Sequence, residues 1–287
     1  MADFYDLQQD LFDHHRAGRY AEGLAVAERM QADFPDRSGI TWYYVACLES
    51  RCGRPEAALA TIRSALDGGQ LWRLRTLEDH DFDSIRERPD FQELKDQAER
   101  RLRELRVEPR VRVTAPDGVR LPPLLLCLHG ASAGLEQFAP YLEPAAAAGW
   151  LAVAAESSQP AGPDTRHWDD PERAFSDLGG FLNQVRAAGH GFDPGRVALA
   201  GFSQGGLLAV DAALGRRPFP VQAVVGVCPS FPRPARLIEL IQREKLPRLR
   251  GAFLVGEDDR PYRAGAEQVH EALVQAGHEV ALQLLPG

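Results

Sequence analysis

A serine stands between two glycines at residues 201–205, in the stretch GFSQG. The apolar run RVALAGF leads into it, and the small-residue run GLLAVDAALG follows it. A strand that turns sharply into a helix presents a serine at the tip of the turn, and glycines are needed on both sides because side chains there would clash. The pattern predicts that Ser203 is a nucleophile. The alternative is a glycine-rich turn that carries a surface serine.

The stretch GFSQGG, together with the strand end LHG at residues 128–130, resembles the phospholipase/carboxylesterase branch of the α/β-hydrolase superfamily, which includes acyl-protein thioesterase-like enzymes. The resemblance covers roughly residues 108–287. It implies that Ser203 attacks a carbonyl carbon and that the backbone N–H groups of Gln204 and Ala131 bind the oxygen that becomes negative. The Ala-Ser-Ala-Gly stretch from Ala131 departs from the commoner Leu-Gly or Gly-Gly version. No metal and no organic cofactor is implied.

The same resemblance places an acid in the stretch GEDD. The Gly-x-x-Asp pattern of the family matches Asp259, which would orient the base. Asp258 is the neighbouring alternative, and Glu257 is the least favoured of the three. A carboxylate here that is not the acid would cap the following helix.

The base is harder to find. The hydrolase order is Ser, then Asp, then His, and only His270 and His278 follow the acid, neither of them after a strand end. His167 and His190 precede the nucleophile, in predicted loops. The resemblance implies a histidine just after the last strand, where this sequence reads LLPG and stops at Gly287. We therefore expect that the base is missing because the chain ends two or three residues early, and that this chain is a poor hydrolase.

Two further residues adjoin the predicted site. Trp168 lies in the loop SSQPAGPDTRHWDD (157–170), which leaves a strand end. It would either form the wall of a substrate-binding pocket or pin the loop to the core. His129, at the end of another strand, is expected to be structural rather than a base. The segment 229–250 is either a rim over the site or a simple crossover helix.

The elements that must position these residues begin near residue 108. Apolar runs at 124–130, 150–157, 196–203, 221–230, 251–259 and 279–287 alternate with helical patterns. Continuous apolar strands separated by helices predict a mostly parallel sheet with helices on both faces, and ligands bind at the carboxyl ends of such strands. The expected fold is therefore an α/β-hydrolase domain over residues 108–287.

Residues 1–105 have a different, helical periodicity. Gly-Arg pairs begin at Gly18 and Gly53, 35 residues apart, each followed by a small-residue helix that contains Ala25 or Ala58. This pattern resembles tetratricopeptide repeats, which are about 34 residues long. Only about two repeats fit, so a plain helical cap is the alternative. Such a domain implies a possible protein partner.

Composition narrows the function class. The chain has 287 residues, a net charge of −8 and a pI near 5.5, which argues against a nucleic-acid surface. No apolar run predicts a membrane span, and the acidic N-terminus is unlike a signal peptide. The four scattered cysteines predict a reduced, cytoplasmic protein without a disulfide framework.

The leading prediction is a serine esterase or thioesterase with a small-molecule ester or acyl substrate. The alternative is a helical-repeat interaction protein on a non-catalytic hydrolase-like scaffold, and a peptidase or lipase on the same fold is a third option.

Overall fold

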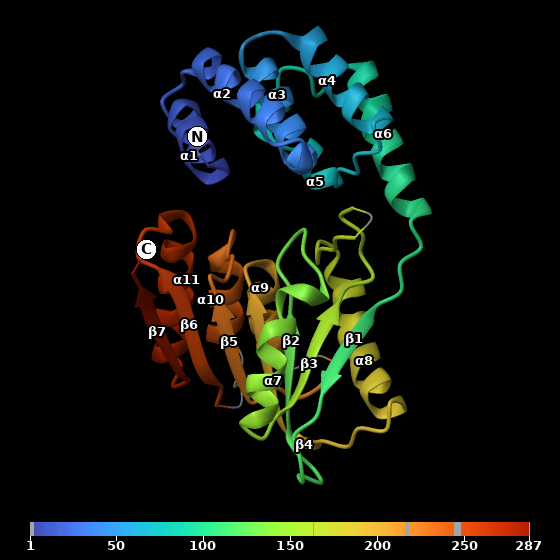
Figure 1. Ribbon diagram of the computed structural model, residues 1–287. Helices are drawn as coiled ribbons and strands as arrows, with labels where there is room; N and C mark the ends of the chain where they lie inside the picture. Colours follow the sequence, from blue (N-terminus) through green and yellow to red (C-terminus); the bar gives the residue numbers. More distant parts are fainter. Residues whose placement is uncertain (1–2, 163, 216–217, 244–247, 287) are drawn as a thin grey trace. The chain divides into compact units, whose positions relative to one another are not determined.

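The computed structural model describes residues 3–162, 164–215, 218–243 and 248–286. The chain divides into two compact units, the first made of residues 1–106 and 161–163 and the second of residues 107–160 and 164–287. The first unit is helical and the second is built on a sheet (Figure 1).

The helical unit is a series of antiparallel helices with short turns. Its elements are α1 (Phe4–Arg16), α2 (Tyr20–Asp33), η1 (Pro35–Arg37), α3 (Ser38–Arg51), α4 (Pro55–Asp67), α5 (Leu74–Leu77), η2 (His80–Phe82) and α6 (Pro89–Glu104). Gly18 and Gly53 occupy the turns after α1 and α3, with φ of 70° and 69°. This left-handed conformation is favourable for glycine alone, which explains why both turns carry one.

Two apolar clusters hold the helical unit together, and α3 belongs to both. Tyr44, Val45 and Leu48 pack with α1 and α2, whereas Ala46 and Cys47 pack with α4 and α6. A helix that buries most of its circumference is central to its unit.

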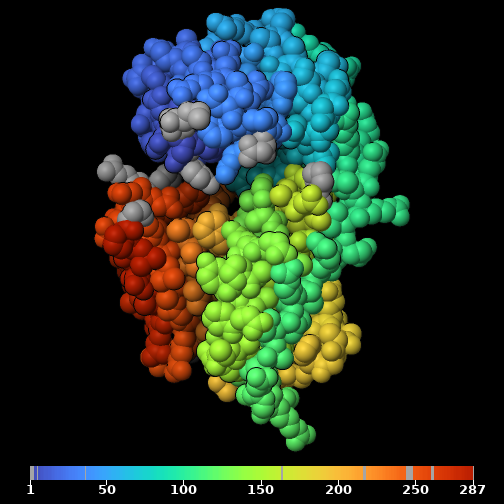
Figure 2. All heavy atoms as spheres, in the orientation of Figure 1, coloured from blue at the N-terminus to red at the C-terminus, as the bar shows by residue number. Residues whose placement is uncertain are grey.

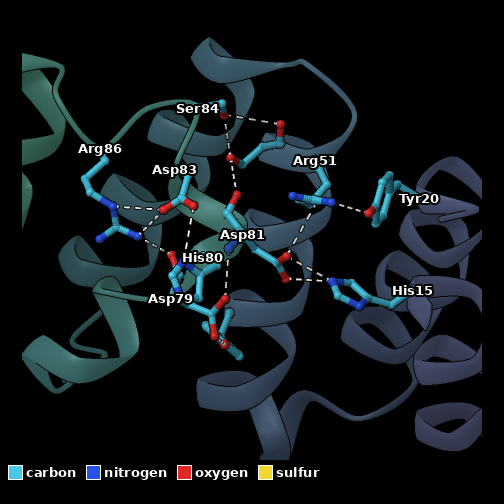
Figure 3. Close-up of polar contacts among 11 residues, drawn as sticks. His15, Tyr20, Arg51, Asp79, His80, Asp81, Asp83, Ser84 and Arg86 are labelled. Carbon is cyan, nitrogen blue, oxygen red and sulfur yellow. Dashed lines mark hydrogen bonds and ion pairs between the residues drawn. The ribbon is translucent and has the colours of Figure 1, made fainter. Parts of the chain in front are cut away.

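A polar cluster around Asp81 ties four elements of the helical unit together (Figure 3). The Asp81 carboxylate lies 2.9 Å from Nε2 of His15 on α1 and 3.6 Å from Nε of Arg51 on α3. Arg51 also bonds the hydroxyl group of Tyr20 on α2. Ser50 Oγ donates to the backbone carbonyl of Asp81 at 2.6 Å. These contacts fix η2 against the first three helices.

The second unit contains one seven-stranded sheet in the order β1-β3-β2-β4-β5-β6-β7. The strands are β1 (Arg110–Thr114), β2 (Pro123–Leu128), β3 (Leu151–Glu156), β4 (Asp193–Phe202), β5 (Ala223–Val227), β6 (Arg250–Gly256) and β7 (Glu279–Leu285). Every pair is parallel except β1 with β3. The carboxyl ends of β2 to β7 therefore share one edge of the sheet.

Helices cover both faces of this sheet. They are α7 (Ala139–Ala147), α8 (Pro171–Ala187), α9 (Gln204–Gly215), α10 (Pro234–Arg243) and α11 (Arg260–Gln275), with the short η3 (Leu135–Gln137) before α7. Alternate residues of β3 mark the two faces, because Val153 and Ala155 join the large core with α8 to α11, whereas Ala152 and Ala154 pack with Leu142 of α7. The expected sheet, mostly parallel and covered on both sides, is confirmed.

The segment 229–250 contains α10, which connects β5 to β6. Its Leu237 and Ile241 are buried in the large core, and the helix packs against α9 and α11. Of the two alternatives for this segment, the packing favours a crossover helix rather than a rim.

The turn between β1 and β2 projects at the lower end of the sheet unit in Figure 2 and exposes Val119 and Leu121.

Within the described ranges, no helix combines the length and the apolar character needed to cross a bilayer.

The backbones of β2, β4 and α9 meet without any side chain between them. A Cβ atom on Gly201 would lie 2.2 Å from the carbonyl carbon of Gly205, and one on Gly205 would lie 2.2 Å from the carbonyl oxygen of Leu128. Real Cβ atoms do not approach so closely. Both positions therefore require glycine for close approach.

We expect Gly205→Ala to destabilise the protein by about 3 kcal/mol or more, because backbone atoms must move to admit the methyl group. Gly180→Ala, in the interior of α8, is the matched control: its Cβ meets no atom within 4 Å, and alanine favours a helix by about 1 kcal/mol over glycine. Urea denaturation followed by circular dichroism measures both. Equal free energies of unfolding for the two variants would show that the turn has room for a side chain.

Candidate active site

Ser203 occupies the sharp turn between β4 and α9. Its φ is 50°, a left-handed value that is strained for a residue with a side chain. The turn is held from both sides: the N–H of Ser203 donates to Val227 O at 2.9 Å, and Ser203 O accepts the N–H groups of Leu207 and Ser230 at 3.2 and 3.0 Å. The strand–turn–helix context predicted around Ser203 is therefore present. A strained, rigidly held serine at a strand end is typical of a nucleophile.

Two backbone donors lie at the same edge of the sheet. Leu128 of β2 pairs with Gly201 of β4, and Ala131 and Gln204 each stand three residues beyond that pair. Across the described chain, neither the N–H of Ala131 nor that of Gln204 has a hydrogen-bond partner. The preceding N–H, of Gly130, donates to Gln137 Oε1 at 2.7 Å. The two unpaired donors could bind an anionic oxygen.

Trp168 is part of the core. Its side chain is 5% exposed, its ring stacks on His129 with centroids 4.7 Å apart, and it meets Phe181 of α8 edge to face. Its Nε1 donates to the carbonyl of His129 at 2.8 Å. The structure thus favours the second alternative for Trp168, a residue that pins its loop, over a wall that faces substrate.

The carboxylate of Asp259 lies beyond β6, and a contact with the side chain of Cys228 acts to lower its pKa. Cys228 directly follows β5, the strand between β4 and β6, and its N–H donates to Leu254 O at 2.7 Å. The residue before it, Val227, accepts the N–H of Ser203. Asp259 is therefore linked to the turn at Ser203 through Cys228 and its neighbour Val227. Partial burial raises the pKa of Asp259, and the contact with Cys228 opposes that rise.

The other two acidic candidates differ from Asp259 in exposure. Glu257 and Asp258 are exposed. The N–H of Glu257 donates to the carbonyl of Leu285, the last residue of β7, at 2.8 Å. The end of β7 thus lies beside the acidic stretch.

His129 is fully committed to local structure. It is 1% exposed, its Nε2 accepts the N–H of Ser157 at 3.2 Å, and its Nδ1 lies 2.7 Å from the carbonyl oxygen of Gly130. Since a carbonyl only accepts, Nδ1 carries the proton and the ring is neutral. Burial lowers the pKa of His129 to about 4. The expectation that this residue is structural agrees with these contacts.

His167 is the second histidine at this edge. Its Nδ1 lies 3.1 Å from the backbone N of Asp169 and 3.3 Å from Asp169 Oδ2, so that nitrogen is engaged by Asp169. Its neighbour Trp168 donates a backbone N–H to Gln204 Oε1 at 2.9 Å.

The remaining histidines of the sheet unit lie toward the opposite edge. His190 precedes β4, and His278 precedes β7. His278 Nδ1 accepts the N–H of Leu249 at 3.1 Å, and burial lowers the pKa of this ring. His270 of α11 bonds Val280 O, near the start of β7, at 3.0 Å. None of these three adjoins the strand ends that carry Ser203.

Two features of this region could not be predicted from the sequence. One is the thiol of Cys228, whose residue has a φ of 42°; no motif marks it, although it lies within the predicted strand run 221–230. The other is the side chain of Gln204, which bonds Asp169 through Nε2 at 2.6 Å as well as Trp168. Over the described ranges, no group of three or more acidic, histidine or cysteine side chains has the geometry to hold a metal ion.

We expect Cys228→Ala to raise the pKa of Asp259 further, because the variant loses the thiol contact that favours the charged carboxylate. The measurement is a ¹³C NMR titration of the Asp259 carboxyl, assigned with Asp259→Asn. Cys52→Ala, in the helical unit, is the control and should leave the titration unchanged. An unchanged or lower pKa in Cys228→Ala would show that the thiol does not support the carboxylate.

The free energy of unfolding should fall as the pH falls from about 6.5 to about 4. The reason is His129: the unfolded chain takes up its proton near pH 6.5, whereas the folded state resists it down to about 4. The full difference between the pKa values of His129 in the unfolded and folded states corresponds to about 3 kcal/mol of unfolding free energy. Since carboxylates also titrate here, the test compares urea denaturation of the wild type and His129→Asn across this window. His129→Asn should show the smaller loss on acidification, and equal losses would contradict the assignment.

Solved structures with the same fold include esterases. Esterase PE8 aligns with a TM-score of 0.52 and 21% identity, over 63% of this chain and 90% of its own. The propionate-bound esterase Est2 of Thermogutta terrifontis aligns with a TM-score of 0.50 and 18% identity, over 63% and 79%. An uncharacterized protein from Bacillus cereus ATCC 10987 aligns with a TM-score of 0.51 and 18% identity, over 100% of this chain and 92% of its own.

No protein-family model and no curated protein matches the sequence. At such low identities the structural likeness bears on the fold alone. It agrees with a mostly parallel sheet covered by helices on both faces. The second unit of the chain therefore has the α/β-hydrolase fold, preceded by a helical unit.

Proposed function

We propose that the sheet unit is a serine hydrolase that cleaves carboxylic ester or thioester bonds through an acyl-enzyme. The observation that carries the proposal is the strained turn at Ser203, with the unpaired N–H groups of Ala131 and Gln204 at the same edge of the sheet. A serine that reacts with a carbonyl needs a hydroxyl group that substrate can reach and two oxyanion donors.

In the proposed reaction, Ser203 Oγ bonds to the carbonyl carbon while a base takes its proton. The carbonyl oxygen becomes negative and is bound by the N–H groups of Ala131 and Gln204. Collapse of this intermediate expels the alcohol or thiol, which receives the proton from the base, and leaves an ester on Ser203. Water then repeats the sequence, releasing the carboxylic acid and restoring the serine. Asp259 orients the base and stabilises its positive charge.

The position from which a base would act follows from the geometry. Each described histidine of the sheet unit either is held by local hydrogen bonds or lies toward the opposite edge. The end of β7 is beside the acidic stretch, since Leu285 accepts the N–H of Glu257. A base that follows β7 would therefore stand next to Asp259.

The chemical class of the substrate is suggested by two lines of support. The sequence resembles the phospholipase/carboxylesterase branch, with its acyl-protein thioesterase-like members, and the solved structures of the same fold include enzymes described as esterases. Both point to a small-molecule ester or acyl substrate. The four cysteines are free, which is compatible with the expected reducing compartment.

The expected activity is slow, Ser203-dependent hydrolysis of p-nitrophenyl acetate that rises when imidazole is added, because none of the described histidines is placed to act as the base and imidazole can take that role. Loss of the triad base costs on the order of a million-fold in turnover. A fluorophosphonate probe should label Ser203 and no other residue, as mapped by mass spectrometry. Ser203→Ala is the control for both measurements and also corrects for the hydrolysis that imidazole performs alone.

The proposal fails if Ser203→Ala and the wild type hydrolyse the ester equally and neither is labelled. Rapid, Ser203-dependent turnover without imidazole would instead assign the base to a histidine already described. His167, whose neighbour Trp168 bonds Gln204, would then be the first to replace.

A second candidate function is protein binding by the helical unit on a non-catalytic hydrolase-like scaffold. The engagement of the described histidines favours it, as does the arrangement of α1 to α4 in antiparallel pairs with glycines at both turns. We propose on this basis that the unit is tetratricopeptide-like. Absence of labelling and of turnover, even with imidazole, would leave this as the remaining candidate.

A further inference from the structure

The side chain of Gln204 joins the nucleophile turn to the loop between β3 and α8. Its Oε1 accepts the backbone N–H of Trp168 at 2.9 Å, and its Nε2 donates to Asp169 Oδ1 at 2.6 Å. A primary amide supplies an acceptor and a donor at the same end of one side chain. Gln204 is therefore matched to an N–H and a carboxylate on adjacent loop residues.

The same loop is bonded to the exit of β2. Trp168 Nε1 donates to the carbonyl of His129 at 2.8 Å, and the N–H of Ser132 donates to the carbonyl of Arg166 at 2.8 Å. Ala131 lies between the two anchored residues His129 and Ser132. The loop is therefore bonded both to the segment that contains Ala131 and to Gln204, the two residues whose backbone N–H groups are the oxyanion donors.

We propose that Gln204 is a positioning residue whose side chain, through Trp168 and Asp169, sets the distance between the backbone N–H groups of Ala131 and Gln204. This inference rests on the proposed function, since the two N–H groups act together only as oxyanion donors.

The physical need for such a contact comes from the limits of strand pairing. The pairing of β2 with β4 ends at Leu128 and Gly201, three residues before either donor. Beyond that pair the two donors lie on separate segments. Oxyanion donors act at about 2.7–3.1 Å, and a misplacement of about 1 Å can cost about 100-fold in rate. A loop bonded to both segments removes their relative freedom.

The chain permits a test that reverses one hydrogen bond. Gln204→Glu keeps the acceptor for Trp168 N–H but places a second carboxylate against Asp169. In the double variant Gln204→Glu/Asp169→Asn, the asparagine Nδ2 donates to the glutamate, so the bond is restored in the opposite direction with the net charge of the wild type. Gln159→Met is the matched control, because Gln159 also makes two bonds to this loop, both to the backbone of Asp170, and none to the nucleophile turn.

The first readout is the ¹H–¹⁵N amide resonance of Ala131, which requires no activity. It should move in Gln204→Glu, return toward the wild-type position in the double variant, and stay within the wild-type range in Gln159→Met. Circular dichroism melting of each variant confirms folding. An unmoved Ala131 amide in a folded Gln204→Glu variant overturns the proposal, and so does a shift of equal size in Gln159→Met.

The second readout is Ser203-dependent hydrolysis of p-nitrophenyl acetate with imidazole. Gln204→Glu should lower kcat by about 10-fold or more with little change in KM, because the donors act in the transition state. The double variant should recover most of this loss. A double variant that folds but stays as slow as Gln204→Glu overturns the role of the contact. If the wild type itself shows no Ser203-dependent turnover, the proposed hydrolase function fails, and the Ala131 amide alone decides whether Gln204 positions that segment.

Discussion

The close approach of backbone to backbone at Gly205 is the constraint on which the candidate site depends. Helix α9 can begin against the carbonyl of Leu128 only because no Cβ intervenes, and the strand before it can turn only because Gly201 lacks one too. This contact brings the first N–H of α9 to the same edge as the loop that follows β2. It also forces Ser203 into a left-handed conformation that few residues adopt without support. The surrounding bonds from β5 and its exit supply that support.

Most polar groups near Ser203 serve to hold loops rather than to react. Both ring nitrogens of His129 form hydrogen bonds that hold the segments after β2 and β3, and burial keeps the ring neutral. Trp168 uses its indole N–H and its backbone N–H in the same way. Asp259 differs, because its carboxylate is only partly buried and the side-chain contact that lowers its pKa is with a thiol. Asp259 is therefore less occupied by structural contacts than His129 and Trp168, and it is the residue to which the motif assigns the role of the acid.

The sheet and the strand–turn–helix at Ser203 could be predicted from sequence because both depend on local signals. Apolar runs of strand length, helical periods between them and the glycines around Ser203 are read directly from neighbouring residues. The acidic stretch was instead located through the family resemblance, by its Gly-x-x-Asp pattern. The roles of Trp168, Cys228 and the Gln204 side chain could not, because each depends on contacts between segments that are far apart in the chain. For example, Gln204 and Asp169 are separated by 35 positions, and no local pattern marks the pair. The state of each histidine likewise depends on which carbonyl or N–H the folded chain brings to its ring.

The strand order has a consequence for the sequence of events during synthesis. The helical unit consists of neighbouring helices that pack pairwise, so its contacts can form as soon as residues 1–106 have left the ribosome. The first strand, β1, has no such local partner, since Arg110 pairs with Glu156 at the far end of β3. The second neighbour of β2 is β4, which is synthesised later still, because β4 ends only at Phe202. Synthesis therefore passes through a stage at which the helical unit is complete while the apolar strands still have open edges. This stage of biosynthesis is the most exposed to aggregation and the most dependent on chaperones.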